Sequence, residues 1–126
     1  MGLDMYAFQR RGALDKPVDF DCRESDEEIF YWRKHPDLHG WMHRLYARKG
    51  GQSEQSARDF NGANVEITAA DLDRLEQDVG RSLLPPTTGF FFGASLPDRA
   101  DDDREFIAKA RAAIAAGYAV YYTSSW

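Results

Sequence analysis

Polar and apolar positions alternate at the start of the chain. Leu3, Met5 and Ala7 fall on one side of an extended segment, and the residues between them, with Phe8, fall on the other. A period of two is typical of a strand with one buried face. We therefore expect a strand over residues 3–8. Residues 9–22 show no sustained period and are predicted to form a loop, with a short extended piece over 18–20.

A helix-start signal follows this loop. Ser25 and Glu28 have the spacing of a capping box and precede the apolar run Ile29–Trp32. The sequence thus predicts a short helix here. Pro36 lacks a backbone donor and clashes with a preceding helical turn, so the chain should kink or restart near His35.

Two longer helices are predicted from apolar positions at steps of three and four. The first begins at Pro36, and the Gly50–Gly51 pair ends it. The polar residues 52–62 should be an exposed loop. After a short strand over 64–67, Thr68 should cap the second helix, which Pro85 stops. The apolar faces of these helices are Leu38, Trp41, Met42 and Leu45 in the first, and Leu72, Leu75, Val79 and Leu83 in the second.

Two aromatic segments predict further strands. Gly89–Gly93 contains three consecutive phenylalanines, and Tyr118–Trp126 is rich in tyrosine. A helix with an acidic start over 98–103 lies between them, and Gly117 ends it. The expected fold class is α+β, or small α/β, with about four strands and about three helices packed on one face of the sheet.

Length and composition narrow the class of protein. A chain of 126 residues with 43% hydrophobic positions supports one core, so residues 1–126 should form a single domain. The formal net charge of -5 argues against a nucleic-acid groove, which needs clustered basic residues. Cys22 is the only cysteine, which favours a reducing compartment. With no signal peptide or apolar span in the sequence, we expect a cytoplasmic protein that does not enter a membrane.

The three histidines are the most unusual polar set. His35, His39 and His43 are spaced by four residues, but each step rotates by about 40° around a helix, so all three cannot face one ion. Only His39 and His43 suit a zinc or nickel pair. The border position of His39 favours a hydrogen-bonded packing role instead. We expect no metal and no cofactor.

Several short motifs resemble those of a family of small uncharacterised phage and prophage proteins. These are Gly2–Tyr6, Tyr31–Lys34 followed by His39 and Trp41, Leu84–Pro85 followed by Gly89–Gly93, and Ser124–Trp126. The resemblance implies that polar and aromatic motif residues serve more than core packing. The ligand-binding residues implied in this way are Asp4, Tyr6, Trp32, Arg33, His39, Ser124 and Ser125.

The sequence favours a binding or interaction module over an enzyme. Trp32 and Arg33 join a stacking surface to a cation, which suits an anionic or aromatic ligand, or Trp32 packs in the core while the cation reaches solvent. The partner would be a protein or a small molecule. The alternative is a small enzyme with a polar site around His39, Asp4 and Arg33, if the first and last strands are neighbours.

Overall fold

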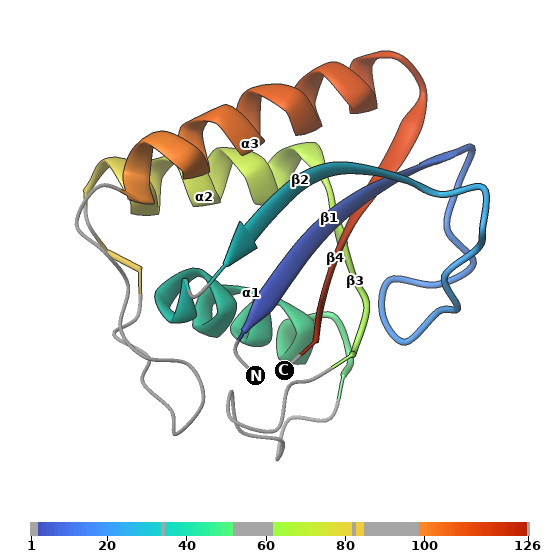
Figure 1. The fold of residues 1–126 in the computed structure, drawn as a ribbon, viewed down its shortest axis with the longest axis horizontal. Helices are drawn as coiled ribbons and strands as arrows, with labels where there is room; N and C mark the ends of the chain where they lie inside the picture. Colours follow the sequence, from blue (N-terminus) through green and yellow to red (C-terminus); the bar gives the residue numbers. More distant parts are fainter. Residues whose placement is uncertain (1–2, 34, 52–61, 82, 85–98, 126) are drawn as a thin grey trace.

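A computed structural model describes residues 3–33, 35–51, 62–81, 83–84 and 99–125. Within these ranges the chain forms β1 (Asp4–Arg11), β2 (Glu27–Arg33), α1 (Pro36–Arg48), β3 (Val65–Ile67), α2 (Ala69–Gly80), α3 (Arg99–Ala115) and β4 (Tyr118–Ser125). The strands build one antiparallel sheet in the order β2-β1-β4-β3 (Figure 1). The predicted α+β class is confirmed, and the first and last strands are neighbours.

The helices cover one face of the sheet. Met5 and Val120 from the strands share one buried cluster with Leu45 of α1, Leu75 of α2 and Phe106 of α3. α2 and α3 run side by side across the sheet (Figure 1). Burial of these apolar stripes provides the main drive for packing the helices on the strands. None of the helices that the structure describes has the length and apolar character needed to cross a membrane.

The sequence predicted the starts of α1 and α2 and the faces of β1 well. The predicted end of the second helix is wrong, because α2 ends at Gly80, and Leu83, expected on its apolar face, lies beyond the helix and is 58% exposed. Leu3, Met5 and Ala7 are fully buried, as their alternation indicated. Thr68 caps α2: its Oγ1 accepts from the backbone N–H of Asp71 at 3.3 Å, and the Asp71 carboxylate accepts from the Thr68 N–H at 2.8 Å. After α1, Gly50 has a φ of +103°, a left-handed conformation that favours glycine.

The helix predicted after Ser25 is wrong, because this segment forms β2. Phe30 and Trp32 pair with Ala7 and Met5 of β1 and point toward the helices, whereas Tyr31 pairs with Tyr6 on the other face. Aromatic residues suit a pleated surface, and pairing with β1 satisfies the backbone. Pairing with β1 therefore outweighs the local capping signal.

The predicted loop over residues 9–22 is also too long, because β1 continues to Arg11. The expected extended piece is present: Val18 forms an isolated antiparallel bridge with Val65. The Glu66 N–H donates to the Pro17 carbonyl at 2.9 Å. Residues 17–19 therefore pair along the outer edge of β3, which would otherwise present unpaired backbone groups.

Several predictions fall on residues that the structure does not describe. The strand at Gly89–Gly93, the loop over 52–61, Lys34 and the terminal Trp126 lie outside the described ranges.

Candidate binding surface

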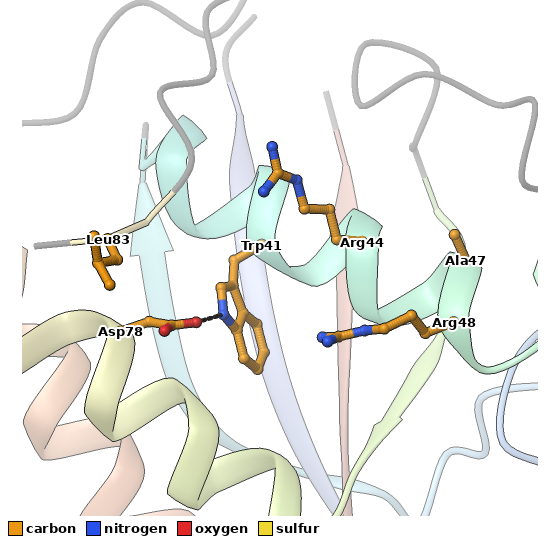
Figure 2. Close-up of a pocket in the computed structure, with 6 residues that line it drawn as sticks. All are labelled: Trp41, Arg44, Ala47, Arg48, Asp78 and Leu83. Carbon is orange, nitrogen blue, oxygen red and sulfur yellow. Dashed lines mark hydrogen bonds between the residues drawn. The ribbon is translucent and has the colours of Figure 1, made fainter. Parts of the chain in front are cut away.

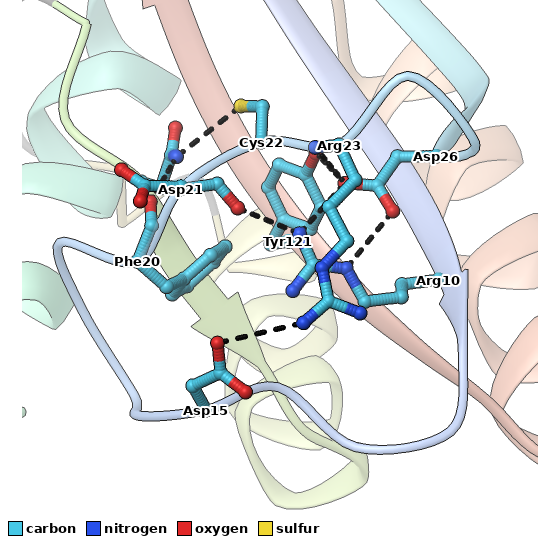
Figure 3. Close-up of polar contacts among 9 residues, drawn as sticks. Arg10, Asp15, Phe20, Asp21, Cys22, Arg23, Asp26 and Tyr121 are labelled. Carbon is cyan, nitrogen blue, oxygen red and sulfur yellow. Dashed lines mark hydrogen bonds and ion pairs between the residues drawn. The ribbon is translucent and has the colours of Figure 1, made fainter.

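The sheet face opposite the helices is covered at one end by the segment 12–26. Phe20 from this segment is buried and packs edge-on against Tyr121 of β4, with 4.9 Å between ring centroids. On its other side, Tyr121 stacks against Phe8 at 5.5 Å. Segment 12–26 therefore covers the part of this face that β4 forms, and we call this segment the lid (Figure 3).

A buried ion pair fixes the lid to the sheet. The Asp26 carboxylate accepts hydrogen bonds from Arg10 Nε and Nη2 at 2.9 and 2.8 Å and from the Tyr121 hydroxyl at 2.6 Å (Figure 3). The Arg10 hydrogen bond is the main reason why the pKa of Asp26 lies well below its usual range. Burial, and then the hydrogen bond to Asp26, raises the pKa of Tyr121 far above its ordinary value. Asp26 thus pairs with both Arg10 and Tyr121, which indicates a structural role.

Beyond the lid, aromatic side chains line the face over β1 and β2. The Tyr6 ring lies 5.4 Å from the Tyr31 ring and 6.1 Å from the Phe8 ring. Tyr31 is 43% exposed, one of two large hydrophobic residues that stand out from the described surface. Tyr31, on the edge strand β2, therefore presents its ring to solvent beside the half-buried ring of Tyr6 on β1.

Charged groups surround the two tyrosines. The Tyr31 hydroxyl donates to Asp4 at 2.5 Å, and Glu28 lies opposite Phe8 in the strand register. Burial, and then the charges of Asp4 and Glu28, raises the pKa of Tyr6. We call this surface the open sheet face; it comprises Asp4, Tyr6, Phe8, Glu28, Tyr31, Arg33 and Ser125.

The structure separates the ligand-binding residues implied by the sequence into two groups. Asp4 lies between Arg33 and Ser125 in the strand register, so these three residues share the open sheet face with Tyr6. The other group points toward the helices and is buried; it consists of Trp32, His39 and Ser124. His39 therefore does not meet Asp4 and Arg33, because the sheet lies between them.

Two of the three histidines, His35 and His39, connect α1 to other elements in the core. His35 is the N-cap residue of α1, and its Nε2 lies 3.0 Å from the Asp103 carboxylate of α3. His39 is fully buried, and its Nδ1 lies 2.6 Å from the Tyr122 hydroxyl. Burial raises the pKa of Tyr122 well above its ordinary value, so its hydroxyl stays protonated. The packing interpretation of His39 is thus confirmed. Within the described ranges, no cluster of three or more histidine, cysteine or acidic side chains is arranged to hold a metal ion.

Sequence reasoning missed Phe8, Glu28 and Tyr31 as members of a surface. Because Tyr31 was predicted to lie in a helix, its position on the opposite strand face from Phe30 and Trp32 was not recognised. The useful signal was the aromatic content of this run, which favours strand over helix.

Comparison with known proteins found no matching family model, no similar curated protein and no similar solved structure.

Proposed function

We propose that this protein is an interaction module that binds a basic segment of a partner protein on the open sheet face. The observation that carries the proposal is the contact between the exposed Tyr31 and the half-buried Tyr6, flanked by Asp4 and Glu28 on a part of the sheet that the lid leaves uncovered. A phage or prophage origin, expected from the sequence motifs, and a place in the bacterial cytoplasm, expected from the composition, belong to the same proposal.

The chemistry of the face favours a cationic side chain. Lysine and arginine bind to the faces of tyrosine rings, and nearby carboxylates strengthen the attraction. Here two carboxylates, Asp4 and Glu28, outnumber the single guanidinium of Arg33 on the open sheet face. An acidic chain of net charge -5 also attracts basic partners at long range.

The enzyme alternative remains a hypothesis without geometric support. It required His39 beside Asp4 and Arg33, and these residues lie on opposite faces of the sheet. A catalytic group must come within hydrogen-bonding reach of its partners.

A peptide titration tests the proposal. Dye-labelled hexalysine should bind and raise fluorescence anisotropy, whereas hexaglutamate should not. A Tyr31→Ala variant should weaken hexalysine binding about fivefold or more, because it loses a cation–π contact. Tyr31 is exposed, so this variant should keep its fold, and circular dichroism would check that it does.

A charge-matched control distinguishes binding at the open sheet face from a general attraction to the acidic surface. The Asp4→Asn Glu28→Gln double variant should weaken hexalysine binding about tenfold. Asp15→Asn Asp101→Asn removes two carboxylates that are 71% and 90% exposed and lie outside the open sheet face, so it should have little effect. Equal losses in the two double variants, or equal binding of hexaglutamate, would overturn the proposal.

A further inference from the structure

A second surface feature lies on the helical side of the molecule, where α1 meets α2. It is an open pocket of about 410 Å³, and its lining residues are Trp41, Arg44, Ala47, Arg48, Asp78 and Leu83 (Figure 2). Steps of three and four residues place Trp41, Arg44 and Arg48 on one side of α1. The pocket shares no residue with the open sheet face.

Both arginines of the pocket are exposed and form no ion pair with any described residue. The neighbouring Lys49 differs, since it pairs with Asp71 across to α2. Basic residues near the end of a helix complement its dipole, and this accounts for Arg44 and Arg48 near the end of α1 and for Lys49 at its C-cap. It does not account for two guanidinium groups at the rim of the same pocket.

The rest of the pocket offers an apolar surface between opposite charges. The Trp41 indole N–H donates to the Asp78 carboxylate at 2.8 Å, which holds the ring in place. In Figure 2, Arg48 extends toward this ring from the side opposite Asp78. Leu83 is 58% exposed, so it presents an aliphatic side chain at the pocket mouth. Trp41 itself is only 4% exposed, so Leu83 provides most of the exposed apolar surface beside the arginines. An apolar surface next to a few charged groups is typical of small-ligand sites.

We propose that this pocket binds a small organic anion with an apolar body. The body would pack mainly against Leu83 and against the small exposed part of Trp41, and Arg44 and Arg48 would bind its oxyanion, a carboxylate or a phosphate. Guanidinium groups suit both oxyanions because their planar donors match two oxygens at once. Asp78 leaves the pocket with two positive charges and one negative, which favours an anion over a cation.

The Trp41 indole N–H provides a local probe. In a two-dimensional NMR spectrum its cross-peak is assigned by its loss in Trp41→Phe. Benzoate and phenyl phosphate serve as the carboxylate and phosphate probes, and benzylamine as a cation of similar size. We expect either anion to shift the Trp41 signal in a saturable way and benzylamine to leave it unchanged. The stronger anion identifies the oxyanion class.

Matched arginine variants decide the outcome. Arg44→Gln Arg48→Gln should weaken anion binding about tenfold, since both charged donors are lost. Arg23→Gln Arg104→Gln removes two arginines that are 55% and 58% exposed elsewhere on the surface, and it should bind as the parent does. The proposal is overturned if neither anion gives a saturable shift, if benzylamine binds equally well, or if both double variants bind like the parent.

Discussion

At the scale of single residues, the Asp26 carboxylate joins the lid to the sheet. Its side chain is 2% exposed and that of Arg10 is 3% exposed, so this ion pair is shielded from water. Removing one partner of such a pair leaves an uncompensated buried charge. Asp26→Ala should therefore lower the free energy of unfolding by about 3 to 5 kcal/mol, measured by urea denaturation.

Asp15 supplies the control for this measurement. It pairs with Arg23 at 3.6 Å, but both side chains are largely exposed. Exposed pairs contribute about 0 to 1 kcal/mol, so Asp15→Ala should leave the urea midpoint almost unchanged. Equal destabilisation by the two variants would mean that burial does not strengthen the Asp26 contact.

At the scale of elements, two capping-box sequences precede different types of secondary structure. The box at Thr68 starts α2, whereas the one at Ser25 precedes β2. Thr68→Ala should cost about 1 kcal/mol, because the Asp71 N–H loses its acceptor, and Thr68→Ser should restore most of that stability. Ser25→Ala should change stability by less than about 0.5 kcal/mol. Thermal unfolding of the three variants tests this, and a larger loss from Ser25→Ala would contradict the strand assignment.

At the scale of the whole molecule, the buried carboxylates make stability depend on pH. The pKa of Asp26 is lowered chiefly by Arg10. Burial alone would raise the pKa of Asp71, but hydrogen bonds from Lys49 and Thr68 outweigh it, and the net shift is downward. A lowered folded-state pKa gives stability that is complete above the unfolded value of about 3.9 and is lost as the pH falls through the folded value.

The thermal midpoint should therefore fall steeply between about pH 5 and about pH 2, with little change from about pH 5 to pH 7. Calorimetry across this range measures the slope. Asp26→Asn should give a lower but flatter curve, because one of the titrating groups is gone. An unaltered slope in that variant would show that Asp26 does not contribute to acid unfolding.

Sequence patterns predicted the open sheet face only in part. Alternation in β1 placed Tyr6 and Asp4 on one face, but it gave no information on their neighbours across the sheet. Arg33 and Ser125 are 29 and 121 positions away from Asp4 in the chain, and only strand pairing brings them beside it. Register is fixed by which side chains the core must bury, and short-range patterns carry little of that information.

Local patterns by themselves determined the apolar faces of β1 and α1, the Thr68 cap of α2 and the α+β class. These features depend on residues a few positions apart, whose geometry is the same in any context. Tertiary structure alone decided that 27–33 is a strand, that His39 and Asp4 are separated, and that Trp41, Asp78 and Leu83 meet at one pocket. Each of these outcomes depends on burial and backbone pairing between distant segments, whose free energy exceeds that of a local helix signal.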